Sequence, residues 1–198
     1  MTRDRRRAPP RPARIVDAAL VLAEERGWAG VRLREVAERF DMPLSELRRH
    51  FRDKDAVADA WLARADAAML ALPEPGFEEL PTRERLFLVI CRWLDALAPH
   101  RRVTGEMLAE KLYPGHPHHN LALVFWVSRT VQWIREAARL DAGGMQKRLE
   151  EIGITALFVA TLAVWVRDDS PGGSRTRRFL ANRLAEAERA MVWLQPKR

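Results

Sequence analysis

Hydrophobic residues recur at intervals of three and four along most of this chain, the spacing that gives an α-helix one apolar face. Near the N-terminus, five such residues share a face: Ile15, Ala18, Ala19, Leu22 and Ala23. Pro12 suits the first turn of this helix and Gly27 suits its end. The pattern predicts a helix over residues 12–26. Because the chain has no run of strand-like alternation, we expect an all-α fold.

Two shorter helices are predicted next, over residues 33–40 and 44–50, with Asp41, Met42 and Pro43 between them. Two short helices joined by so tight a turn must cross steeply. The second can then enter a DNA major groove while the first braces it. The pattern therefore predicts a helix-turn-helix DNA-binding head over residues 12–55.

The rest of the chain alternates long helical stretches with breaks rich in Pro and Gly. These stretches predict six more helices, about nine in all, over residues 53–72, 81–97, 102–112, 121–140, 145–167 and 174–194. We expect residues 56–198 to form a helical domain for ligand binding and dimerisation. The apolar run over 152–166 is too short to cross a bilayer and is predicted to be a buried core helix.

The formal net charge is +7, which favours a polyanionic partner, either nucleic acid or an acidic membrane surface. Part of this charge lies in an Arg-rich arm over residues 1–11, which is either a solvated tail or a segment that follows phosphates beside the head. A single cysteine excludes an internal disulfide and fits a reducing compartment. Since no signal peptide is visible, we expect a cytoplasmic protein.

Inward positions of the third helix are taken by Leu47, with Phe51 just beyond it, so Arg48 and Arg49 must point outward. There they can contact phosphates or guanine edges, or form a merely solvated basic face. Leu44 can touch a thymine methyl group and Glu46 can accept from a cytosine amino group, although an acid near phosphates is repelled. The predicted DNA contacts are Arg32, Leu44, Ser45, Glu46, Arg48, Arg49, His50, Arg52 and Lys54.

Large aromatic side chains lie on the predicted helices of the second part of the chain. Trp126 and Trp133 are seven residues apart and so share a helix face. Such a stripe indicates either core packing or an apolar pocket for a hydrophobic effector or lipid. The predicted pocket is lined by Trp93, Met107, Leu108, Phe125, Trp126, Thr130, Trp133 and Phe158.

The last two predicted helices carry apolar residues with no other obvious burial partner. Two helices from each of two chains would form a four-helix bundle, so we expect a homodimer. The predicted contact residues are Leu157, Val164, Phe179, Leu184 and Met191.

Candidate chemistry is sparse elsewhere. His116, His118 and His119 cluster in a Pro-rich segment, but no carboxylate or thiol lies near them in the sequence, so no metal site is predicted. Cys91 has apolar neighbours and is predicted to be a buried, inert thiol. Because no nucleotide-binding loop or hydrolase motif is present, we predict neither a cofactor nor enzymatic activity.

About the first 65 residues resemble the DNA-binding head of the TetR family of bacterial repressors. The matching features are the Ile-x-x-Ala-Ala start at Ile15, Gly27, Val36-Ala37, His50-Phe51 and Lys54. The resemblance implies a TetR-type fold and a homodimer that binds a palindromic operator in double-stranded DNA. It also implies a body that binds a small hydrophobic effector, and it makes Lys54 a phosphate-contacting residue.

Three positions depart from that family pattern. Asp41, Pro43 and Arg48 stand where the family usually has a turn Gly, a capping Ser or Thr, and a Tyr. A missing cap costs about 1 kcal/mol, and we expect Asp41 to cap the third helix in part.

The C-terminal half resembles a second family with the same architecture, the lipid-binding proteins that assist ubiquinone biosynthesis. The residues that carry this likeness are Asp66, Met69, Thr161, Asp168, Ser170, Pro171, Thr176, Phe179, Leu180 and Arg183. The alternative function is thus a lipid-binding accessory protein without DNA binding. That family's further membrane-binding helix is not expected after Trp193, so we predict no integral membrane association.

Overall fold

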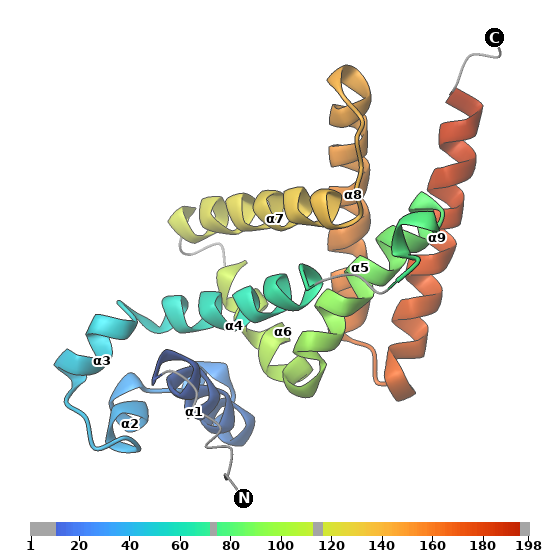
Figure 1. The fold of residues 1–198 in the computed structure, drawn as a ribbon. Helices are drawn as coiled ribbons and strands as arrows, with labels where there is room; N and C mark the ends of the chain where they lie inside the picture. The colour runs from blue at the N-terminus through green and yellow to red at the C-terminus, as the bar shows by residue number, and fades with distance from the viewer. Residues whose placement is uncertain (1–10, 72–74, 113–116, 195–198) are drawn as a thin grey trace, which may run out of the picture. The chain divides into compact units, whose positions relative to one another are not determined.

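The computed structural model describes residues 11–71, 75–112 and 117–194, which form nine α-helices and no strand (Figure 1). This confirms the all-α prediction. The helices are α1 Arg11–Arg26, α2 Leu33–Glu38, α3 Leu44–His50, α4 Lys54–Met69, α5 Thr82–Leu97, α6 Arg101–Lys111, α7 Pro117–Ala137, α8 Gly144–Val166 and α9 Ser174–Leu194. The largest difference from prediction is that α7 begins at Pro117 instead of residue 121, since Pro is accepted in a first helical turn.

The chain divides into two compact units. The first comprises Met1–Ala63 and Arg102–Glu110, and the second comprises Arg64–Arg101 and Lys111–Arg198. The first unit is therefore larger than the predicted head, because it takes in part of α4 and most of α6. The predicted basic arm lies outside the described residues, except for Arg11 at the start of α1.

The first unit is built around one apolar residue set. Ile15 of α1, Val36 of α2 and Leu47 of α3 are each at most 1% exposed. Trp28, in the short 3-10 turn Trp28–Gly30 after α1, is equally buried. Burying a large apolar side chain stabilises a fold by roughly 1.5–3 kcal/mol, so this core holds the three short helices at their crossing angles.

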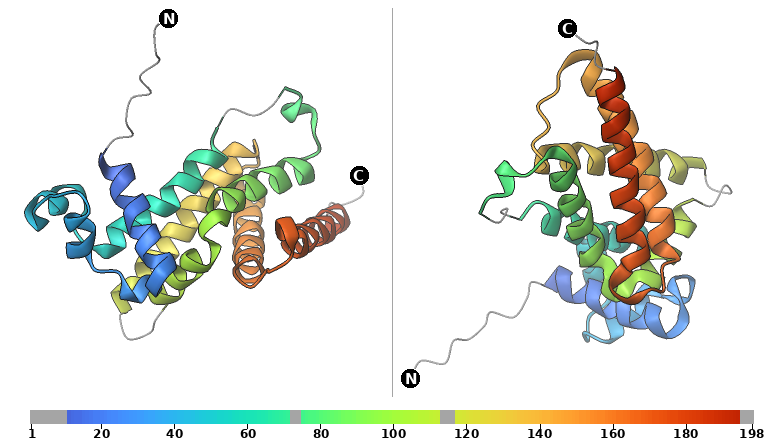
Figure 2. Two further views of the ribbon diagram at one scale, coloured as in Figure 1. Left: turned by 90° about the horizontal axis from the view of Figure 1, so that it is seen from below. Right: turned by 90° about the vertical axis from the view of Figure 1, so that its right-hand side faces the viewer.

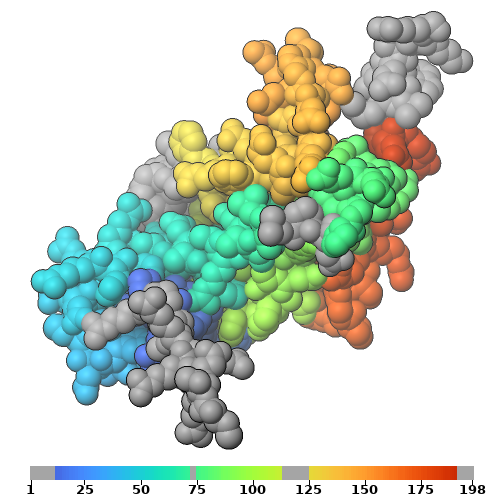
Figure 3. All heavy atoms as spheres, viewed as in Figure 1, coloured from blue at the N-terminus to red at the C-terminus, as the bar shows by residue number. Residues whose placement is uncertain are grey.

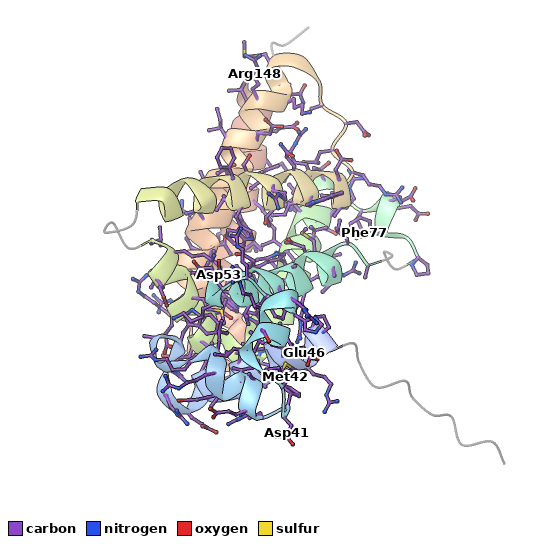
Figure 4. The ribbon with its side chains drawn as sticks, turned by 90° about the vertical axis from the view of Figure 1, so that its left-hand side faces the viewer. Asp41, Met42, Glu46, Asp53, Phe77 and Arg148 are labelled. Atoms are coloured by element: carbon purple, nitrogen blue, oxygen red, sulfur yellow. The ribbon has the colours of Figure 1, made fainter. Side chains whose placement is uncertain are left out.

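The turn between α2 and α3 differs from the sequence prediction. Asp41 has a left-handed backbone with a φ of 50°, and Figure 4 shows its side chain pointing away from the turn. The N-cap of α3 is Pro43, with no side-chain hydrogen bond. The expectation that Asp41 caps α3 is therefore wrong, because the backbone conformation that closes the turn directs the carboxylate outward.

In the second unit, α8 and α9 lie side by side (Figures 1 and 2) and are joined through Asp168. This carboxylate is fully buried and accepts hydrogen bonds from the N–H and hydroxyl of Ser170, at 3.0 and 2.5 Å, and of Thr176, at 2.8 and 2.5 Å. Burial acts to raise the pKa of Asp168, but these hydrogen bonds outweigh it and hold the pKa below its usual range.

Helix α8 is apolar on two opposite faces. Phe158 and Trp165 are at most 3% exposed, whereas Ile152 is 67% and Val159 is 46% exposed. The prediction of a buried core helix is therefore corrected, since the described residues cover only one face of α8. Among the described residues, α8 is also the one helix whose length and apolarity would suffice to cross a membrane. Of its most apolar stretch, 22% is buried. Its first turns stand out from the surface in Figure 3.

Candidate nucleic-acid interface

Helix α3 presents a mixed polar and basic face to solvent. Leu47 is 1% exposed and points into the core, which turns Leu44, Ser45, Arg48 and Arg49 outward. Glu46 and His50 are half-buried at the edges of this face. The predicted outward orientation of Arg48 and Arg49 is confirmed, while their contact with DNA stays a prediction.

The ion pairs of the first unit set these two arginines apart. Most of its other cations have a carboxylate partner, as in Arg26–Glu35 at 2.7 Å and Arg52–Asp53 at 3.0 Å. Within the described residues, neither Arg48 nor Arg49 takes part in an ion pair. Two solvent-facing positive charges without an internal counterion are what a phosphate backbone attracts.

Arg32 is also exposed, at the residue that precedes α2. Its guanidinium donates to the Ala29 carbonyl at 2.8 Å. The side chain makes no capping hydrogen bond, so the N-terminus of α2 has no side-chain cap. A cation at this place can reach DNA only by extending away from that carbonyl.

Lys54 makes contacts within its own unit that were not predicted from the sequence. Its ammonium lies 3.0 Å and 3.1 Å from the two carboxylate oxygens of Glu110 and 5.2 Å from the Trp28 ring centroid. Its side chain is only 23% exposed. The predicted phosphate contact is not tested by this arrangement, but it requires Lys54 to leave Glu110.

Three charged residues of α6, spaced four apart, face α1 and α4 within the first unit. Arg102 donates to the Glu24 carbonyl at 2.8 Å, near the C-terminal end of α1. Glu106 accepts from the Trp28 N–H at 2.5 Å, and Glu110 pairs with Lys54. None of the three was predicted from the sequence, where their i, i+4, i+8 spacing on a predicted helix was the available signal.

An aromatic cluster forms in the second unit around Trp93. Its ring lies 5.9 Å from that of Trp126 and 5.1 Å, edge-on, from that of Phe158. The indole N–H of Trp93 donates to Asp66 at 2.8 Å. Burial raises the pKa of Asp66, against the lowering effects of this hydrogen bond and of the nearby Arg129. Thr130 is 1% exposed, and its hydroxyl lies near enough to the Asp66 carboxylate to lower the pKa of Asp66 as well.

The structure brings together only part of the predicted pocket. Phe125 and Trp133 are 67% and 44% exposed, so the prediction that they line an enclosed pocket is wrong for the single chain. A shared helix face does not ensure a shared depth, because a neighbouring helix covers only part of the length of α7. Met107 and Leu108 are buried and belong to the first unit, and their predicted place in a pocket stays a prediction.

The residues predicted to form the dimer contact differ in how far they are buried. Leu184 is 4% exposed within the chain, so its placement at a dimer contact is corrected: it has burial partners inside its own unit. Leu157, Val164 and Phe179 are half-buried. The side chain of Met191 lies outside the described residues.

Cys91 is 5% exposed, and burial raises the pKa of its thiol to about 11, which confirms a buried thiol without nucleophilic character. Within the described part of the chain, no group of three potential ligands could hold a metal ion. His116 lies outside that part, as do the side chains of His118 and His119.

Comparison with known proteins decides the family. A model of the tetR family of bacterial regulatory proteins matches residues 15–61. The crystal structure of a TetR transcriptional regulator from Nitrosomonas europaea ATCC 19718 shares 41% identity and a TM-score of 0.79, covering 89% of this chain and 97% of that one. The chain belongs to the TetR family. A second TetR regulator, from Rhodococcus sp. RHA1, shares 19% identity with a TM-score of 0.60 and supports the fold alone.

Further matches to curated relatives and to a second family model accompany this TetR-family assignment. The HTH-type transcriptional regulator YjdC of Escherichia coli (strain K12), like that of Shigella flexneri, is 34% identical over 113 residues, which is 54% of this chain. The match spans 59% of the length of each of these relatives. The COQ9 family model matches residues 146–191, so the second resemblance is limited to the α8–α9 region. TetR-family proteins are regulators and are typically not enzymes.

Proposed function

We propose that this TetR-family chain is a DNA-binding transcriptional repressor that acts in the cytoplasm as a homodimer on a palindromic operator. The observation that carries this proposal is the exposed face of α3, where Arg48 and Arg49 have no ion-pair partner in the part of the chain that the structure describes. The match to the tetR family model, over residues 15–61, includes this face. A major groove admits one α-helix, and two heads about 34–36 Å apart would meet successive grooves.

The side chains of α3 divide by role. Arg48 and Arg49 supply affinity through phosphates or guanine edges, and Leu44 and Ser45 lie beside them for base contacts. Glu46 narrows the choice of sequence, since its carboxylate is repelled by phosphates and satisfied by a cytosine amino group.

A gel-shift titration with the DNA upstream of the protein's own gene tests the proposal. Arg48→Ala/Arg49→Ala should weaken binding at least tenfold and reduce the salt slope by about two, because each lost phosphate contact removes roughly one released counterion. The matched control is Arg175→Ala/Arg178→Ala, which removes the same charge from exposed residues of α9. Absence of wild-type binding to any duplex at low salt would contradict the proposal.

The second copy is proposed to pack on the exposed apolar stripe of α8. This stripe lies opposite the buried face of the helix and consists of Met145, Leu149, Ile152, Ala156, Val159 and Ala163. A helix that is apolar on two opposite faces is normally covered on both of them, so a second chain is a physically adequate partner.

The effector site is proposed to lie at the Trp93, Trp126 and Phe158 cluster. Its apolar rings suit a hydrophobic ligand, while Asp66 and the buried Thr130 hydroxyl supply orienting polar groups. Mass spectrometry of the natively purified protein should detect a bound apolar molecule that is lost in Trp126→Ala. An identical spectrum for both proteins would contradict this site.

The alternative function, a lipid-binding accessory protein, is favoured by the COQ9 match at residues 146–191. It shares the ligand prediction but differs on DNA. A co-purifying isoprenoid lipid together with no duplex binding at low salt would establish the alternative over the repressor.

A further inference from the structure

The ammonium of Lys54 is surrounded by groups of its own unit. Glu110 places both carboxylate oxygens within 3.1 Å, the Trp28 carbonyl lies 3.4 Å away, and the Trp28 ring lies 5.2 Å away. An ammonium has three N–H donors, and these contacts occupy the directions in which it would otherwise reach a phosphate. The family's phosphate-contacting lysine is thus engaged internally when no DNA is bound.

Glu110 differs from the other acid on the same face of α6. Glu106 accepts hydrogen bonds from the Trp28 N–H at 2.5 Å and from Arg102 at 2.6 Å, so it is fixed by two donors. For Glu110, the described residues provide one partner, Lys54, and its side chain is 41% exposed. A pair as exposed as this is worth at most about fivefold in an equilibrium constant, so a phosphate can compete for the lysine.

We propose that Glu110 is an autoinhibitory counterion that holds Lys54 away from DNA, and that displacement of the last turn of α6 releases Lys54 to a phosphate. This inference rests on the proposed DNA binding. Glu110 lies in the last turn of α6, which ends at Lys111. Arg102 and Glu106 anchor the preceding turns to α1 and Trp28, so the end of the helix can move while its start stays attached.

Fluorescence anisotropy across a series of KCl concentrations tests the proposal. The probes are a labelled duplex from upstream of the protein's own gene and a random duplex of the same length. Glu110→Gln, which keeps the shape and removes the charge, should tighten binding about two- to fivefold and steepen the salt slope by about one counterion. Glu110→Ala should act in the same direction.

A double-mutant cycle separates this mechanism from a general charge effect. In the Lys54→Met background, Glu110→Gln should no longer tighten binding, because no lysine remains to be released. Asp141→Asn removes the same charge from an exposed residue of the second unit and should leave both the affinity and the slope unchanged. Thermal melts of each variant establish that the folds are intact.

The outcomes distinguish the two proposals. If wild type binds and Glu110→Gln changes neither affinity nor slope, or if its gain persists without Lys54, the autoinhibitory contact is overturned while DNA binding stands. Weaker binding by Glu110→Gln also overturns the autoinhibitory contact, since Glu110 would then only stabilise the fold of the head. If neither wild type nor Glu110→Gln binds any duplex, the DNA-binding function itself fails, and this inference fails with it.

Discussion

Gly27 illustrates how one residue satisfies two constraints at the end of α1. Its φ of 76° lies in the left-handed region that side chains disfavour. In addition, a Cβ placed there would lie 3.2 Å from the Glu106 carboxylate oxygen that accepts from Trp28. The residue therefore allows both the reversal of the chain after α1 and the close approach of α6.

Gly27→Ala is expected to lower the free energy of unfolding by about 1–2 kcal/mol, from backbone strain and displacement of Glu106. Urea denaturation followed by circular dichroism measures this. Gly153→Ala is the matched control with the opposite sign: a Cβ added there, within α8, would meet no neighbouring group within 4 Å, so it should stabilise by up to about 1 kcal/mol. Equal effects of the two changes would contradict this account of Gly27.

Asp168→Asn is expected to cost about 2–3 kcal/mol of stability at pH 7, because an amide cannot accept all the bonds that Ser170 and Thr176 donate. The folded-state pKa of Asp168 is lowered. Its contribution is therefore fully present above the unfolded-state pKa of about 3.9 and declines as the pH falls below about 4. Urea midpoints at about pH 7 and about pH 3.5, on either side of that pKa, should show a gap between the variant and wild type that narrows at the lower pH. A constant gap would exclude this role for the carboxylate.

At the scale of elements, α2 is a short helix whose N-terminus lacks a side-chain cap. Its N-cap, Arg32, instead donates to a carbonyl of the preceding turn. Helix α3 is in the same situation, with Pro43 as its N-cap. The helical hairpin is therefore held by core packing of Val36 and Leu47 more than by its own ends.

Arg32→Thr should separate stability from DNA affinity. Threonine can cap α2 and raise the free energy of unfolding by about 1 kcal/mol, while loss of the cation should weaken DNA binding and lower the salt slope by about one. Urea unfolding and anisotropy measure the two effects. Arg34→Thr removes the same charge inside α2 and should destabilise instead. If Arg32→Thr left DNA affinity unchanged, Arg32 would not belong to the interface.

At the scale of the whole molecule, the exposed face of α8 determines the expected assembly. Met145, Leu149 and Ile152 are each more than half exposed on a helix whose opposite face is buried. Exposed apolar surface of this kind marks an interaction site. The proposed homodimer through α8 would cover this surface and bring two heads to one operator.

Ile152→Glu is expected to convert the dimer to a monomer in sedimentation velocity, because a carboxylate at a desolvated contact is strongly unfavourable. Affinity for the upstream DNA should fall at the same time, since each monomer binds a single half-site. Leu70→Glu is the control, as Leu70 is 42% exposed but lies beyond the end of α4. A variant that remains dimeric would move the interface elsewhere.

Features that depend on short-range order could be predicted from the amino-acid sequence alone. Helical periodicity predicted α3 over residues 44–50 and the outward direction of Arg48 and Arg49, because the burial of Leu47 fixes the opposite face of the same helix. Local motifs likewise indicated the family that the comparisons then established.

Contacts between residues far apart in the chain became known only from the folded structure. Lys54 and Glu110 are 56 residues apart, and no periodicity could predict that they pair. In the same way, Leu184 was covered and Ile152 left open because of where neighbouring helices lie. A repeating pattern specifies which side of a helix is apolar, but only packing specifies which apolar side meets the chain itself and which is left for a partner.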